Sequence, residues 1–145
     1  KELNFKIAFG QHSGVIGNSE DLYELPRFPI NEKYGNLERF STLLKTIPFS
    51  YETVTPSEKY INNNTNPPNV TVKFSSNNKN LKSITCFSNE EDKWRKSKIN
   101  FINENEIKII LDGKFTTERG RINCSLREKG GFFRWLGMQF VIAEK

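Results

Sequence analysis

The chain has 145 residues, of which 35% are hydrophobic and 27% are charged, so it contains enough apolar material for a folded core and is not disordered throughout. The formal net charge is +5, but the lysines and arginines are scattered along the chain, so the composition does not indicate a nucleic-acid partner. No stretch of the sequence is long and apolar enough to span a bilayer as a helix.

The first elements are predicted to be a short strand at Phe5–Phe9, a glycine-containing loop and a second short strand at Leu25–Ile30. The second run contains two prolines, which exclude a central antiparallel strand but allow a short or edge strand. A helix capped by Asn31 or Asn36 is expected next, because apolar residues recur there at helical spacing, at Leu37, Phe40, Leu43 and Leu44. One helix and two strands cannot cover their own apolar faces, so residues 1–55 are interpreted as a piece of a larger α/β unit.

A change in composition follows at residues 56–69. This stretch is rich in asparagine and contains the pair Pro67-Pro68, which is typical of a linker. Short strand candidates separated by polar turns then continue to residue 145. They lie at Val70–Phe74, Leu81–Phe87, Lys98–Ile102 and Glu106–Leu111, and in a closing hairpin. Such spacing predicts an antiparallel β-sandwich over residues 70–145, in a chain that is α+β but mainly β.

The closing hairpin is the strongest strand signal and extends over 120–142. Apolar residues alternate in its first half, and Phe133 and Trp135 begin the second half, after a loop with two adjacent glycines. We expect these two aromatic residues to belong to the core. The alternation changes phase near Leu136-Gly137, where the glycine indicates a bulge or a close approach of another backbone.

The two cysteines, Cys86 and Cys124, both lie in strand-like runs. They are either two buried thiols or one disulfide, and a disulfide would imply an oxidising compartment. The chain has a single histidine and no Cys-x-x-Cys motif, so the usual zinc sites are excluded by count.

Short motifs in the first segment resemble the end of a NodB-type polysaccharide deacetylase, one of the carbohydrate esterases that remove N-acetyl groups from glycans. These motifs are similar to the last strands and helix of the poly-N-acetylglucosamine deacetylase branch, and they comprise Ala8–Gly14, Leu25–Ile30 and Leu37–Phe40. Later motifs resemble a β-domain that follows such barrels in some bacterial deacetylases. They comprise Asn66–Pro68, Ile84–Phe87, Gly120–Cys124 and Phe133–Trp135.

The resemblance implies that residues 1–55 are the terminal strand-helix piece of a (β/α) barrel, followed by a linker at 56–69 and a β-sandwich domain at 70–145. It also implies a secreted or periplasmic protein of the bacterial cell envelope, with an N-acetylglucosamine polymer or a similar glycan as its partner. Because the chain opens at Lys1 without a methionine, we expect it to be a fragment or a processed product that lacks the N-terminal barrel.

The family holds a divalent metal, zinc or similar, with an aspartate and two histidines from a His-x-x-x-His type motif. His12 is the only histidine of this chain, so we assign no catalytic or metal-ligating residue and expect no cofactor in it. The parent enzyme is expected to be metal-dependent, and this chain alone is expected to be inert.

The resemblance places Gln11, His12 and Arg27 at the rim of the missing barrel's active site, where loops after barrel strands line the cleft. The alternative for His12 is a surface histidine bonded to neighbouring backbone. The alternative for Arg27 is an ion pair with a residue such as Glu24 or Glu32.

Trp94 lies in the charged stretch Glu90–Lys96, so its ring is either exposed, where it could stack on a sugar, or folded back under the loop. This residue is the candidate glycan contact of the β-domain. Two other classes of protein compete with a deacetylase fragment: a free-standing carbohydrate-binding or adhesion module, and a structural β-domain that supports a barrel.

Overall fold

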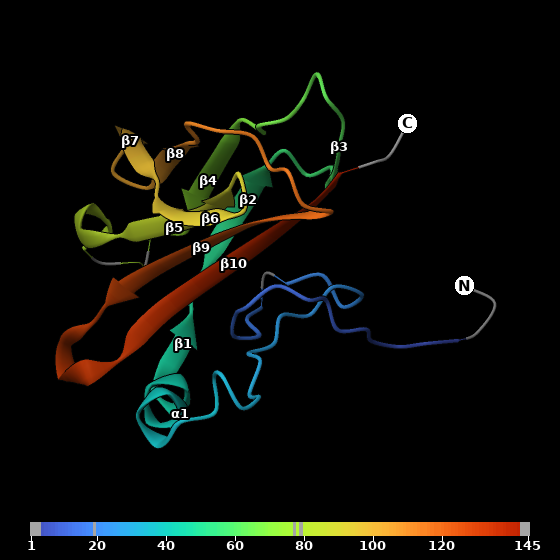
Figure 1. The fold of residues 1–145 in the computed structure, drawn as a ribbon. Coiled ribbons are helices and arrows are strands. Elements are labelled where there is room, and N and C mark those ends of the chain that lie inside the picture. The colour runs from blue at the N-terminus through green and yellow to red at the C-terminus, as the bar shows by residue number, and fades with distance from the viewer. Residues whose placement is uncertain (1–3, 19, 77, 79, 143–145) are drawn as a thin grey trace.

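The computed structural model describes residues 4–18, 20–76, 78 and 80–142. Strands dominate this part of the chain, and the helical elements are short (Figure 1). In chain order the elements are α1 (Leu37–Leu44), β1 (Thr46–Pro48), β2 (Tyr51–Thr55), β3 (Tyr60–Ile61), β4 (Val70–Phe74), the 3₁₀ turn η1 (Leu81–Ser83), β5 (Thr85–Glu90), β6 (Lys93–Lys96), β7 (Lys98–Asn103), β8 (Glu106–Ile110), β9 (Arg119–Arg127), the 3₁₀ turn η2 (Lys129–Gly131) and β10 (Phe133–Ile142).

Within the described residues the strands form two sheets. The larger sheet has the order β1-β10-β9-β5-β6, with β3 also paired to β10, and the smaller sheet has the order β2-β4-β8-β7. Neighbouring strands are antiparallel except at β10, which β1 and β3 join in parallel. The prediction of a mainly β chain is therefore confirmed.

The core lies between the two sheets, because side chains from both contribute to one buried cluster. In β9 the buried residues alternate with partly exposed ones, as expected for a strand with one face on the core. The smaller sheet supplies apolar residues at the same spacing. Fully buried members of the cluster include Val70, Val72, Phe74, Ile107, Ile109, Ile122, Leu126 and Phe140. Burial of each such side chain stabilises the fold by about 1.5 to 3 kcal/mol.

The hairpin of β9 and β10 has an unbroken register from Phe133↔Arg127 to Val141↔Arg119. Of the two alternatives expected near Leu136-Gly137, a bulge or a close approach of another backbone, the structure shows the second. A Cβ at Gly137 would lie 1.8 Å from the Ser13 carbonyl oxygen. Leu136, Met138 and Phe140 of β10 enter the core and Phe133 and Trp135 do not, so the expectation that these two aromatic residues belong to the core is wrong.

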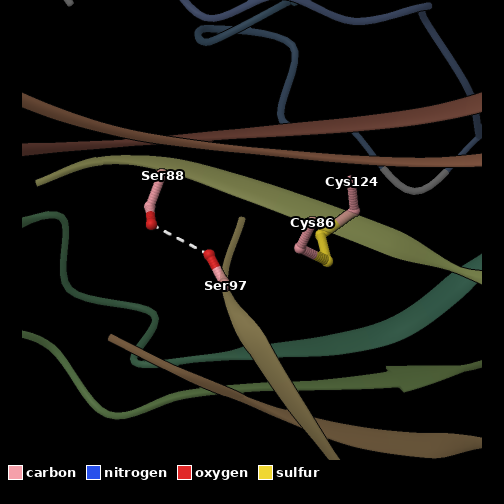
Figure 2. Close-up of a disulfide and its surroundings, with 4 residues drawn as sticks. All are labelled: Cys86, Ser88, Ser97 and Cys124. Atoms are coloured by element: carbon pink, nitrogen blue, oxygen red, sulfur yellow. Dashed lines mark hydrogen bonds between the residues drawn. A yellow bond between two sulfur atoms is a disulfide. The ribbon is translucent and has the colours of Figure 1, made fainter. Parts of the chain in front are cut away.

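A disulfide joins Cys86 of β5 to Cys124 of β9, with an S–S distance of 2.02 Å (Figure 2). The two residues are register partners on neighbouring strands, and both are fully buried. Close to the disulfide, the hydroxyl oxygens of Ser88 and Ser97 lie 2.8 Å apart. Ser97 connects β6 of the larger sheet to β7 of the smaller one. This hydrogen bond therefore fixes the point where the chain passes between the sheets.

Strands of both sheets occur within residues 46–69. The structure therefore differs from the prediction of a domain boundary at residue 55 and a linker at 56–69. β1 pairs with β10, β2 pairs with β4, and β3 lies inside the predicted linker and pairs with β10. The buried Asn66 side chain accepts a hydrogen bond from the Phe115 N–H at 2.9 Å and donates one to the Phe115 carbonyl at 2.8 Å. The stretch is thus held by main-chain pairing and by a side-chain clamp.

Within residues 4–18 and 20–36 the chain crosses the outer face of the larger sheet, on the side away from the smaller sheet (Figure 1). The strand predicted at Phe5–Phe9 is reduced to an isolated parallel bridge between Phe9 and Leu25. The predicted helix is confirmed as α1, and Asn36 is its cap, since the Asn36 side chain accepts a hydrogen bond from the Arg39 N–H. No residue of α1 is buried within the described structure.

Candidate functional site

A cleft of about 1080 Å³ lies between the N-terminal segment and the edge of the larger sheet. We refer to it as the cleft. One wall comes from residues 10–12, 20, 21 and 24, and the other comes from residues 51, 54 and 57–60. Glu118, Arg119 and residues 136–139, 141 and 142 complete the lining. These segments are far apart in the sequence, so only the folded chain brings them together.

Contacts across β10 hold the N-terminal wall of the cleft in place. The indole N–H of Trp135 donates to the Ser13 carbonyl at 3.1 Å, and the ring packs edge-on against Phe28 with 5.4 Å between centroids. Because Gly137 has no side chain, the backbone at Ser13 can lie directly on the strand. His12, next to Ser13, is thereby set into the cleft.

His12 is 6% exposed and lines the cleft. Its Nδ1 atom is enclosed and has no hydrogen-bond partner among the described residues. Burial, and to a smaller degree the nearby charge of Lys59, lowers the pKa of His12 to about 4. The imidazole is therefore neutral at pH 7, with a free nitrogen for a ligand.

Glu20, Glu24, Tyr51 and Lys59 form a group of titratable side chains in the same cleft. Burial raises the pKa of both glutamates and lowers that of Lys59, although the glutamate charges partly offset the effect on the lysine. Tyr51 is hydrogen-bonded to Glu20, and burial, assisted by that carboxylate, raises the pKa of the phenol. Each of these groups is held in an environment that disfavours its charged form, which is a common property of binding and catalytic sites.

Two glutamines add neutral polar groups to the cleft. Gln11 accepts a hydrogen bond from the Arg119 guanidinium, which links the N-terminal segment to β9. The Oε1 atom of Gln139 is enclosed without a hydrogen-bond partner in the described structure. The cleft therefore offers amide, hydroxyl, imidazole and carboxylate groups together, and the His12 Nδ1 and Gln139 Oε1 atoms have no hydrogen-bond partner among the described residues.

Of the candidate residues named from the sequence, the structure brings Gln11 and His12 together. Arg27 does not line the cleft; its backbone N–H donates to the His12 carbonyl at 3.1 Å, and its side chain is exposed. Within the described residues it forms no ion pair with Glu24 or Glu32.

Trp94 is separate from the cleft, on the edge strand β6, and is 52% exposed. It lies in a regular hairpin, where it pairs with Asn89, and not in an irregular charged loop. Phe87 is a diagonal neighbour on the same face of this hairpin and is 42% exposed.

Sequence reasoning did not identify Glu20, Glu24, Tyr51 or Lys59 as site residues. Each is a common polar residue with no local motif around it, and the four come from two distant stretches. The available signal was the glycine-flanked Gln11-His12 pair, which indicated a polar cluster but not the residues opposite it.

No group of three histidine, cysteine, aspartate or glutamate side chains in the described part of the chain could hold a metal ion. The residues present therefore do not fit the divalent metal that the resemblance implies for a parent enzyme. The described structure also contains no helix long and apolar enough to cross a membrane.

Comparison with known proteins gives no relative from which a function could be transferred. No protein-family model matches the chain, and no significant match was found among curated proteins or solved structures. The chemistry of the residues is thus the basis for assigning a function.

Proposed function

We propose that this chain is the C-terminal part of a polysaccharide deacetylase that removes N-acetyl groups from a glycan, and that the chain itself supplies no catalytic residue. The carrying observation is the apolar surface that the N-terminal segment leaves uncovered. Large apolar side chains with high exposure concentrate before residue 45, and they include Phe5, Phe9, Leu22, Ile30, Leu37 and Leu44. Soluble domains rarely leave so much apolar surface open unless another body covers it.

The missing barrel is the covering body that this proposal requires. The Phe9↔Leu25 bridge is parallel, which is the strand arrangement of a (β/α) barrel and not that of a free hairpin. α1 has an apolar side, yet Leu37 is 85% exposed and Leu44 is 71% exposed. An amphipathic helix with its apolar side in water is best explained by a packing partner. The N-terminal segment would then be the last part of the barrel wall.

The metal-ligating groups available to the barrel and to this chain determine the role proposed for each. Hydrolysis of the N-acetyl group breaks the amide C–N bond with water and yields acetate and a free amine on the sugar. The barrel would contribute the metal ligands and the base, since the described residues here do not form such a set. Gln11 and His12 would face the glycan from the end of the barrel wall. The disulfide supports a secreted or periplasmic location, because such bonds persist in oxidising compartments.

A second candidate is a carbohydrate-binding module without an enzymatic parent. The observation that favours it is the exposed pair of Trp94 and Phe87 on one face of the β5–β6 hairpin. Pyranose rings stack on such aromatic faces, and Lys96 lies opposite Phe87 as a hydrogen-bond donor.

Acetate release from N-acetylglucosamine oligomers tests the proposal. We expect the protein encoded by the complete reading frame to release acetate in the presence of zinc, cobalt or nickel, and the chain of residues 1–145 to release none at any metal concentration. Metal-dependent turnover by the isolated chain would refute the proposed division of labour. A complete reading frame without the Asp and His-x-x-x-His elements would instead favour the binding module.

A further inference from the structure

We propose that the cleft binds a saccharide with protonated amino groups, such as a glucosamine oligomer. The inference rests on the proposed function in one respect: deacetylation converts a neutral acetamido group into an amine that is cationic at neutral pH. The chain would then hold the product of the reaction.

The first observation is the charge of the lining. Among the described residues it contains five carboxylates but only two lysine or arginine side chains, Lys59 and Arg119. The carboxylates are those of Glu20, Asp21, Glu24, Glu58 and Glu118. The lining is therefore acidic although the whole chain carries a formal charge of +5. None of the five carboxylates forms a salt bridge with another described residue.

The two cations leave this negative charge largely uncompensated. Arg119 is engaged with the neutral Gln11, and the Lys59 ammonium lies 5.5 Å from the centroid of the Phe140 ring. The charges of Glu20 and Glu24 act on Lys59 from beyond ion-pair distance. Glu20 is hydrogen-bonded to the neutral Tyr51, and neither glutamate forms an ion pair with a described residue, so a ligand ammonium beside them would meet carboxylates that lack a cationic partner.

The second, independent observation is the set of enclosed polar atoms without partners. His12 is 94% buried on the cleft wall, since its exposed fraction is 6%, and its Nδ1 atom is unpartnered in the described structure. Gly10 packs against both side chains: a Cβ built there would lie 2.8 Å from Nδ1 and 3.2 Å from the Glu24 Cγ, so the His12 ring and Glu24 both lie close to this glycine. A neutral imidazole and a carboxylate that line the same cleft suit an N–H₃⁺ or O–H donor.

The remaining lining matches a saccharide better than an anion. The cleft volume of about 1080 Å³ accommodates a ligand of several rings. Tyr60 is 67% exposed at the wall and offers a ring face, while Gln139 and Tyr51 offer an amide and a hydroxyl for sugar hydroxyls. An anion would meet three more negative than positive charges in the described lining.

Isothermal titration of the whole chain tests the inference, with the glucosamine tetramer and the N-acetylglucosamine tetramer as probes of equal length. We expect the glucosamine tetramer to bind at least about tenfold more tightly, because charge-assisted hydrogen bonds distinguish the two probes. The double variant Glu20→Gln/Glu24→Gln should lose about tenfold in affinity for the glucosamine tetramer. Glu32→Gln/Glu104→Gln is the matched control, since both residues are exposed, lie outside the cleft lining and should leave the affinity unchanged.

A second double variant distinguishes a loss of binding from a folding defect. Glu58 and Glu118 are exposed at the cleft, so Glu58→Gln/Glu118→Gln should keep the wild-type melting temperature and weaken binding of the glucosamine tetramer by about threefold. Equal affinity for the two tetramers, or binding of pentalysine without binding of the glucosamine tetramer, would overturn the inference. If the glucosamine tetramer binds as expected while the complete protein releases no acetate, the cleft assignment stands and the proposed function fails.

Discussion

His12 is held neutral by its surroundings, although an exposed histidine would be partly protonated near neutral pH. Burial is the larger cause of its lowered pKa, and the charge of Lys59 is the smaller one. In the unfolded chain the pKa should return to about 6.5. The unfolded state therefore binds a proton between about pH 6.5 and 4 that the folded state does not bind. The contribution of His12 to stability is present above this window and is lost as the pH falls through it.

A proton NMR titration checks this directly, because His12 is the only histidine of the chain and its imidazole signals need no further assignment. We expect a midpoint at about pH 4. A midpoint near 6.5 would show that the ring is exposed. The stability of wild type relative to His12→Gln should fall between pH 6.5 and 4. Because the pKa values of Glu20 and Glu24 are raised, their effect on stability has the opposite sign: it favours the folded state as the pH falls. Both glutamates are present in wild type and in His12→Gln, so this effect is common to the two proteins.

The two tryptophans should respond differently to replacement by alanine. Trp135→Ala removes the hydrogen bond to Ser13 and the ring contact with Phe28, so we expect a loss of about 2 to 3 kcal/mol and faster proteolysis before residue 37. Trp94→Ala should change the free energy of unfolding by less than about 0.5 kcal/mol, because the ring is half exposed. Thermal melting and limited proteolysis of both variants decide this. A larger loss for Trp94→Ala would reverse the two roles.

At the level of elements, the strands with a regular apolar alternation could be predicted from the sequence and the shortest ones could not. β4, β8 and β9 carry apolar residues at every second position, and this pattern is visible in any window. β1 and β3 have three and two residues, too few for a period to appear. The assignment of Trp135 to the core failed because both faces of β10 are covered, one by the core and one by the N-terminal segment.

The disulfide closes a loop across the centre of the larger sheet. The two cysteines are 38 positions apart, so on the chain-entropy estimate the bond stabilises the fold by about 4 kcal/mol. We expect Cys86→Ala/Cys124→Ala to lose about this amount, and unfolded, unreduced wild type to present no reactive thiol. Thiol titration under denaturing conditions measures the second quantity. Two reactive thiols per chain would exclude the bond.

At the scale of the whole molecule, the β-domain begins earlier than its composition suggests. Phe49 is 2% exposed and belongs to the core, and β2 covers the edge of the smaller sheet. The asparagine-rich stretch misled the boundary prediction because its polar residues form turns and a clamp and do not separate two bodies. The cleft could be predicted only in part, since a motif located Gln11 and His12 but nothing local located Tyr51 or Lys59.

Truncation tests this boundary. A chain of residues 46–145 should fold with a cooperative thermal transition, whereas a chain of residues 56–145 should not, because it lacks β1, β2 and the ring of Phe49. Loss of a buried phenylalanine alone costs about 3 to 5 kcal/mol, a large part of the stability of a domain of this size. Circular dichroism during heating distinguishes the two chains. Cooperative unfolding of the 56–145 chain would restore the boundary at residue 55.

A substitution at Gly137 should affect the N-terminal segment and the β-sandwich differently. Its α-hydrogen faces the Ser13 carbonyl, so even alanine there would collide with the N-terminal segment while the core side of β10 stays as it is. A methyl group at this position would act as a spacer that lifts one wall of the cleft and leaves the sandwich folded. The loss of stability should therefore be limited to the contacts of the N-terminal segment, and a Gly137→Ala protein should keep a folded sandwich while losing the shape of the cleft.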